Sequence, residues 1–160
     1  MRWALGAAVA GILLASCGGG TDREKVTLGE WAIAVCGTVD DPEPVLSILS
    51  VASEDTQRAQ EAAQFVADEI GEIRVELDGL DPPREARAYH RALVSLMDLI
   101  SDLYAGAAND LEGMSDHDEM RGVLLGVAVE TIAATDALER DSSGSENTAA
   151  KAALDLAGCG

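Results

Sequence analysis

The sequence predicts an all-α protein folded as an antiparallel four-helix-type bundle, and three observations support this prediction. Apolar residues recur at alternating spacings of four and three, the pattern of helices that bury one face in a bundle. No segment shows the two-residue alternation typical of a half-buried strand. The chain has four prolines among its 160 residues, and all of them lie where a helix is expected to begin. The longest apolar run consists of Val45, Leu49, Ala52, Thr56, Ala59, Ala63, Val66, Ile70, Ile73, Leu77 and Leu80.

The first two helices are expected at about 27–37 and 43–79. Thr27 is followed three residues later by Glu30, which is the capping-box pattern at a helix start. The second helix could bend at the sequence Ser-Glu-Asp (53–55), where Ser53 could cap a fresh start. Its continuity past this point is left open.

Three more helices follow, at about 82–112, 116–140 and 146–157. Ser115 and Ser145 stand immediately before the last two and are the expected N-caps. Short connections make consecutive helices antiparallel. We therefore expect three long helices, with the short first and last helices sharing the fourth position of the bundle.

Charged residues support the hairpin between the second and third helices. Arginines lie at the start of the third helix and carboxylates near the end of the second, so each cluster is at the helix end where the macrodipole disfavours its charge. Pairing the two helices places the two clusters side by side. A charge ladder is therefore expected to set the register of this hairpin. Its members are Arg84, Arg87 and Arg91 on one side and Glu69, Glu72, Glu76 and Asp78 on the other. His90, beside the apolar stripe, is expected to bond near Glu69 or Glu72.

Residues 1–16 are typical of an export signal, with one cation, Arg2, before an apolar stretch from Trp3 to Ala15. The stretch is too short to cross a membrane, which takes roughly 20 apolar residues, and it ends in small residues as cleaved signals do. The residues at its end, Leu14, Ala15, Ser16 and Cys17, resemble the lipobox of bacterial lipoproteins. The alternative is an ordinary secretory signal, with Cys17 an incidental thiol.

The lipoprotein resemblance implies that the signal is cut before Cys17 and that a diacylglycerol is attached to its sulfur. Residues 17–25 would then be a lipidated cysteine and a flexible, glycine-rich tether, and residues 26–160 the helical domain. The implied location is outside the cytoplasm, anchored to the membrane by lipid. Gly18 stands where an aspartate would favour inner-membrane retention, so the cell surface and the periplasmic face both stay open. The domain itself resembles small helical bacterial lipoproteins without an assigned role.

Two further cysteines, Cys36 and Cys159, form an even pair once Cys17 carries lipid. In an oxidising compartment such a pair is expected to form a disulfide. The bridge would join the first helix of the domain to the C-terminus. The alternative is two buried free thiols.

The formal net charge of −18 excludes the basic surface on which nucleic-acid binding depends. The same charge repels anionic lipid headgroups, so the lipid anchor would have to hold the domain at the membrane. Such a charge usually makes a protein soluble. The more specific function that it can serve is the binding of cations.

The segment 114–120 carries the candidate metal ligands. Thioether and imidazole groups suit copper, whereas carboxylates suit hard divalent cations such as calcium. The alternative is an acidic helix start with one methionine in the core. The candidates are Met114, Asp116, His117, Asp118 and Met120.

The helix at 116–140 is apolar on almost all sides between Val123 and Ala134, so we expect it to be the most enclosed. Gly122 and Gly126 each cost about 1 kcal/mol relative to alanine inside a helix, which close packing or a small pocket would justify. Glu130 is the one charge in that stretch. These three residues mark a possible ligand pocket, and a pair between Glu130 and Lys151 is the structural alternative.

The sequence holds no nucleophile elbow, zinc-protease motif, phosphate-binding loop or dinucleotide fingerprint, and its two histidines are far apart. We therefore expect no catalysis and no cofactor beyond a possible divalent cation. The predicted function is an exported, lipid-anchored module that binds a protein or small molecule. The alternative is an extracytoplasmic copper- or divalent-cation-binding protein using residues 110–120.

Overall fold

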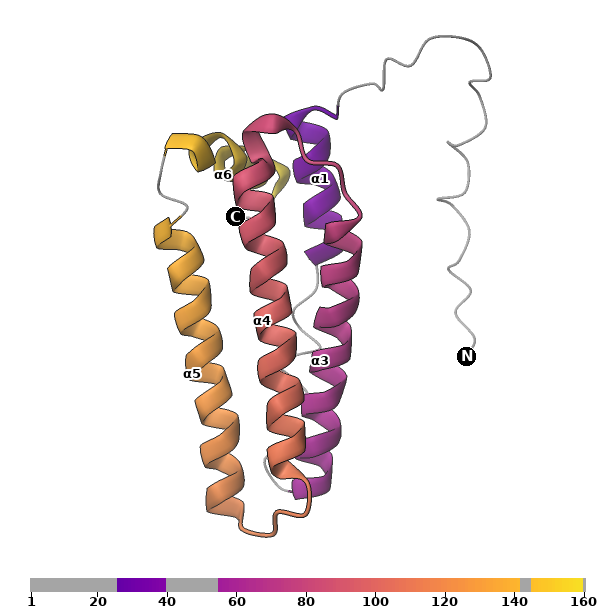
Figure 1. The fold of residues 1–160 in the computed structure, drawn as a ribbon, viewed down its shortest axis with the longest axis vertical. Helices are drawn as coiled ribbons and strands as arrows, with labels where there is room; N and C mark the ends of the chain where they lie inside the picture. The colour runs from indigo at the N-terminus through magenta and orange to yellow at the C-terminus, as the bar shows by residue number, and fades with distance from the viewer. Residues whose placement is uncertain (1–25, 40–54, 142–144, 160) are drawn as a thin grey trace, which may run out of the picture.

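The computed structural model describes residues 26–39, 55–141 and 145–159. All regular secondary structure in these ranges is helical, and the helices pack against one another (Figure 1). The all-α prediction is therefore confirmed. The helices are α1 (Leu28–Val39), α3 (Thr56–Asp78), the short 3-10 helix η2 (Arg84–Ala86), α4 (Arg87–Leu111), α5 (His117–Asp141) and α6 (Ser145–Ala157).

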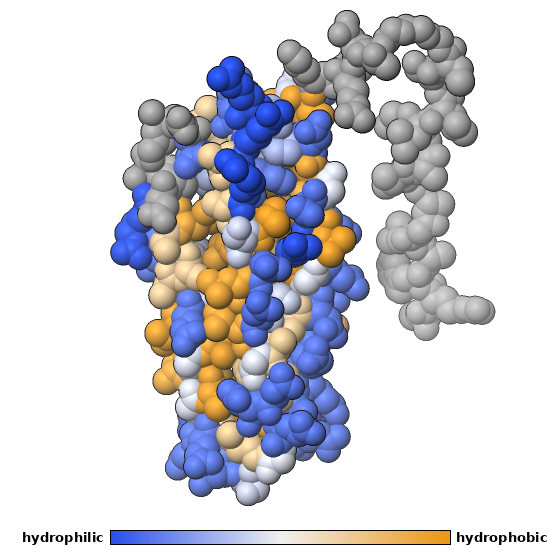
Figure 2. Space-filling model, viewed as in Figure 1, coloured by the Kyte–Doolittle hydropathy of each residue, from blue (hydrophilic) through white to orange (hydrophobic). Residues whose placement is uncertain are grey.

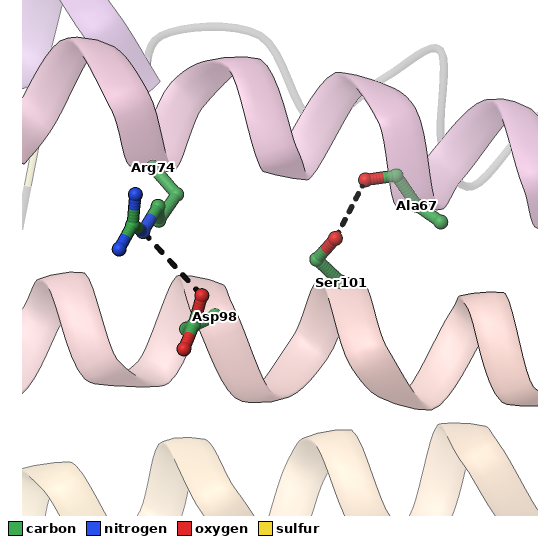
Figure 3. Close-up of polar contacts among 4 residues, drawn as sticks. All are labelled: Ala67, Arg74, Asp98 and Ser101. Atoms are coloured by element: carbon green, nitrogen blue, oxygen red, sulfur yellow. Dashed lines mark hydrogen bonds and ion pairs between the residues drawn. The ribbon is translucent and has the colours of Figure 1, made fainter.

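The three long helices lie side by side, with α4 between α3 and α5 (Figure 1). The contact between α3 and α4 is the most extensive in the fold, because small side chains let the two backbones approach closely. Gly71 of α3 faces Ser101 of α4, whose Oγ donates a hydrogen bond of 2.8 Å to the carbonyl oxygen of Ala67 (Figure 3). The buried alanines of this contact are Ala59, Ala62, Ala63 and Ala67 of α3, with Ala107 and Ala108 of α4.

The charge ladder predicted for this hairpin is wrong in its pairs. Arg87 and Arg91 donate from Nε to backbone carbonyls, those of Pro82 and Arg87 respectively. The ion pair that joins the two helices is Arg74 with Asp98, 3.4 Å apart (Figure 3). Long arginine side chains can reach backbone carbonyls close to them in sequence. Such hydrogen bonds form without any precise register between the two helices. A half-exposed pair of this kind stabilises the fold by about 0–1 kcal/mol.

The helix starts follow the predicted chemistry, but one of the predicted caps is wrong. The capping box is confirmed: the Thr27 amide donates to Glu30 Oε2 at 2.8 Å, and the Glu30 amide donates to Thr27 Oγ1 at 3.2 Å. The cap of α3 is Asp55, whose Oδ1 accepts from the Gln57 amide. Ser53 and the predicted residues 43–54 of this helix lie outside the described ranges.

The predicted cap of α5 is wrong by one residue. Asp116, not Ser115, accepts hydrogen bonds at Oδ1 from the amides of Asp118 at 2.8 Å and Glu119 at 3.2 Å. Serine and aspartate are comparable caps, so the sequence alone could not choose between neighbours. The carboxylate also interacts favourably with the positive end of the helix dipole.

The two short helices lie at the end of the molecule where α3 turns into α4 (Figure 1). α1 packs mainly against α6, and α6 also packs on η2. Trp31 of α1 is 1% exposed and packs edge-on against Tyr89 and His90 of α4, with ring centroids 6.5 and 6.2 Å apart. This aromatic cluster fixes α1 on the long helices.

The prediction that the helix at 116–140 would be the most enclosed is wrong. α5 packs chiefly against α4 and only slightly against α3. Its inner face carries Met120 and Val127, which are buried. Leu125, Val129 and Ile132 on the opposite face are exposed. The sequence shows that this helix carries apolar residues on two faces. It does not show whether other parts of the same chain cover both faces.

Candidate functional site

The disulfide predicted between Cys36 and Cys159 is present, with Cα atoms 5.5 Å apart and a sequence separation of 123. It ties the last part of α1 to the residue pair that follows α6. Gly158, just before the bridge, adopts a φ of 98°, a left-handed conformation that glycine takes without strain. Its amide bonds back to the Leu154 carbonyl at 3.0 Å, which ends α6 and turns the chain toward Cys36.

An apolar groove of about 450 Å³ lies between α1 and α6. Ile33 on α1 and Leu156 on α6 are 66% and 91% exposed, which is high for branched apolar side chains. Alanines on α6 leave the floor of the groove shallow. The lining includes Leu28, Gly29 and Ile33 of α1 and Ala152, Ala153 and Leu156 of α6. This groove is the candidate functional site, because both of its walls are held in place and its surface is mainly apolar.

The opposite face of α1 explains why the groove is firmly positioned. Trp31, Ala32, Val35 and Cys36 of this helix are all buried. The Trp31 indole donates from Nε1 to Nδ1 of His90 at 3.3 Å. His90 was expected to bond near Glu69 or Glu72, and that expectation is wrong. The actual partner lies 59 residues away in sequence, and local spacing carries no signal for such a contact.

His90 is held in its neutral form. Burial lowers the pKa of its imidazole below the ordinary 6.5, and this effect outweighs the opposing influence of the Asp78 charge and the Leu77 backbone. Because Trp31 donates to Nδ1, that nitrogen must carry its lone pair and the proton must sit on Nε2. The histidine is thus part of the support beneath the groove.

We expect the free energy of unfolding to fall with decreasing pH below 6.5 because of His90. The unfolded chain takes up a proton near pH 6.5 while the folded state, with its lowered pKa, does not. The loss therefore grows by about 1.4 kcal/mol per pH unit until the folded pKa is reached. His90→Asn keeps an acceptor for Trp31 but cannot be protonated. Urea unfolding of both proteins between pH 5.5 and 7.5 measures the difference, and equal slopes would contradict the assignment.

The candidate metal ligands are divided between core and surface. Met120 is fully buried, Met114 packs partly buried against the core, and His117 and Asp118 are exposed. The carboxylate of Asp116 is engaged as the cap of α5. Within the described ranges, no group of three or more His, Cys, Asp or Glu side chains is arranged to hold a metal ion.

The pocket considered at Gly122, Gly126 and Glu130 does not form from these residues. All three are exposed on α5, and a Cβ added at either glycine would meet open space. Close packing among the described residues therefore does not explain the two glycines. The nitrogen Nζ of Lys151 lies 3.5 Å from the carbonyl oxygen of Glu139, so the predicted pair with Glu130 is wrong as well.

A second hollow of about 410 Å³ lies where α3 turns into α4. Arg84 and Arg87 line it together with Asp81 and Glu85. The two cations and two carboxylates balance each other, so the hollow offers an anion no net attraction.

Cys17 lies outside the described residues, as do the signal and tether proposed for residues 1–25. None of the described helices combines the length and apolar character needed to cross a membrane. No protein-family model matches the sequence, and no curated protein matches it. No solved structure matches the fold.

The sequence patterns did not predict the groove between α1 and α6. Its walls come from segments more than a hundred residues apart, and alanine, leucine and isoleucine form no motif. The available signal was the even number of cysteines left once Cys17 is set aside. It correctly predicted the disulfide that joins α1 to the C-terminus. Adding the helical positions of Ile33 and Leu156, off the buried face of each helix, would have indicated the groove.

Proposed function

We propose that this protein is an exported, lipid-anchored, non-catalytic module that binds a protein partner through the groove between α1 and α6. The observation that carries the proposal is the exposure of Ile33 and Leu156 beside a mainly apolar groove. Apolar residues gathered on a rigid surface are typical of an interaction site. The proposed architecture is a four-helix-type bundle in which α1 and α6 share the fourth position.

The shape of the groove favours a protein over a small molecule. Small-molecule pockets bury about 70–90% of their ligand, whereas Leu156 stands 91% exposed at the edge of this groove. An open apolar surface of this kind suits the side chains of a partner helix or loop. Burying one exposed leucine-sized side chain contributes about 1.5–3 kcal/mol.

The position of the groove also fits the proposed anchor. α1 begins at Leu28, a short tether away from the lipid proposed on Cys17. Eight flexible residues have a root-mean-square reach of roughly 16 Å, so the groove would lie close to the membrane surface. The expected partner is therefore itself a membrane-associated protein.

Photocrosslinking in the cell that makes the protein tests this function. A photoreactive amino acid at Leu156 or Ile33 is expected to give one discrete protein adduct in the membrane fraction. Val75 of α3 provides the matched control, because it is 62% exposed but lies outside the groove. Adding Ile33→Asp to the Leu156 probe should reduce the adduct at least tenfold while leaving thermal unfolding within about 0.5 kcal/mol, as for other surface substitutions.

Two outcomes would overturn this proposal. Equal labelling from Val75 and Leu156 would mean that the groove has no selective partner. Adducts with lipid alone would mean that the groove lies against the bilayer and binds no protein.

A further inference from the structure

The outer face of α5 carries an apolar stripe that the described helices leave exposed. Leu125, Val129 and Ile132 follow one another at spacings of four and three, so they lie in a row on one face. They are 66%, 57% and 62% exposed. Figure 2 shows apolar surface reaching the edge of the molecule over α5. We call these three residues the outer stripe.

Two glycines lie beside the outer stripe, and no packing among the described residues requires them. Gly122 and Gly126 are exposed, and an added Cβ at either would contact nothing. Each makes the helix less stable than alanine would, by about 1 kcal/mol. Small residues at this four-residue spacing allow a second helix to approach closely. The stripe and the glycines thus point independently to a helix as the occupant.

The charges that bracket the outer stripe identify which helix fits. Exposed residues along this face of α5 include Asp118, Arg121, Leu125, Val129, Ile132, Asp136, Glu139 and Arg140. Reversing the order about Val129 sets Leu125 opposite Ile132 and Arg121 opposite Asp136. Each match holds to within one residue, or about 1.5 Å along the helix axis. A parallel pairing would instead set every charge against its own copy.

We infer that α5 pairs antiparallel with α5 of a second copy of this chain, centred on Val129. The pairing is a two-fold symmetric interface in which the same face serves both partners. This surface is separate from the groove between α1 and α6, so self-association and partner binding can occur together. Each inference can therefore fail without the other.

The overall charge sets the salt dependence of this association. Each copy carries a formal charge of −18, so two copies repel one another at long range. Salt screens that repulsion, with a Debye length of about 10 Å at 0.1 M. The close pairs across the interface are affected less because they are partly desolvated. Dimer formation is therefore expected to strengthen as salt is raised from low concentration, with Kd falling at least threefold.

Cysteine crosslinking of the full chain tests the pairing and its direction. Cys17→Ser is included throughout, so that the introduced thiol is the one available for an intermolecular bridge. Val129→Cys is expected to form a disulfide-linked dimer. A mixture of Leu125→Cys and Ile132→Cys chains should form the mixed dimer. Either variant alone should not, because antiparallel pairing separates the two copies of position 125 by about 12 Å along the axis, beyond disulfide reach.

Glu130→Cys is the control for chance collisions, since position 130 is exposed on α5 but lies to the side of the outer stripe. It should give at least tenfold less dimer than Val129→Cys. Absence of a Val129→Cys dimer would overturn the inference, and would mean that a different protein or another part of the chain covers the stripe. Efficient dimers of Leu125→Cys alone and Ile132→Cys alone would also overturn it, by showing parallel pairing.

Charge reversal provides a second measurement, by sedimentation equilibrium of the Cys17→Ser chain. Arg121→Asp or Asp136→Arg alone is expected to raise the dimer Kd about tenfold, because two symmetric pairs become repulsive, each changing by about 0.7 kcal/mol. The double variant should restore the Kd to within threefold of the parent value. These positions are exposed, so far-ultraviolet circular dichroism should stay unchanged. Additive weakening in the double variant would contradict the proposed register.

Discussion

Replacing Cys36 and Cys159 with serine is expected to lower the free energy of unfolding by about 4–5 kcal/mol, the largest effect of any change proposed for this chain. The bridge closes a loop that spans 123 positions, and its removal returns that loop entropy to the unfolded chain. Denaturant unfolding of the full chain measures the loss. Reduction of the wild-type protein should lower stability to the same degree.

Cys17→Ser is the matched control for this experiment, because it removes a thiol without opening the bridge. It should leave the unfolding free energy of the delipidated protein unchanged. Hydrogen exchange should show the loss of protection concentrated in α1 and α6, the helices that the bridge joins. A difference below 1 kcal/mol between the bridged and serine forms would contradict the role assigned to the disulfide.

Trp31→Ala is expected to cost about 3–5 kcal/mol, the usual range for removing a large aromatic side chain from a core. Trp31 is almost fully buried, and its loss also removes the donor to His90 and the edge-on contacts to both aromatic rings of α4. Thermal and denaturant unfolding measure the change. Intrinsic tryptophan fluorescence of the wild-type protein should follow the same transition, since this indole is packed in the core.

Ile33→Ala is the control on the same helix, because Ile33 points into the groove and is largely exposed. It should cost no more than about 0.5 kcal/mol. Similar losses from Trp31→Ala and Ile33→Ala would mean that α1 is not fixed through its buried face. The groove would then lack the rigid wall on which the proposed function depends.

The helices could be predicted from the sequence because their signals are local. The spacing of apolar residues predicts α3, α4 and α5, and Thr27 with Glu30 marks the start of α1 to within one residue. The cap of α5 was misplaced because serine and aspartate compete at adjacent positions, and only the backbone geometry decides between them. The disulfide followed from the number of cysteines together with the compartment expected for the chain.

The candidate site could not be predicted in the same way. The groove depends on how α6 lies across α1, and the Trp31–His90 hydrogen bond joins residues far apart in sequence. The face of α5 was misjudged for a related reason. Its residues are apolar enough for burial, but the sequence does not say whether the cover comes from the same chain, and the structure leaves Leu125, Val129 and Ile132 exposed.

The most direct test of the account as a whole is the intact mass of the protein extracted from its own membrane, measured with and without reductant and alkylation. The account predicts a chain that begins at Cys17, carries acyl groups, and exposes two alkylatable thiols only after reduction. An unlipidated chain beginning at another residue would contradict the proposed anchor. Two thiols that react before reduction would contradict the bridge between Cys36 and Cys159.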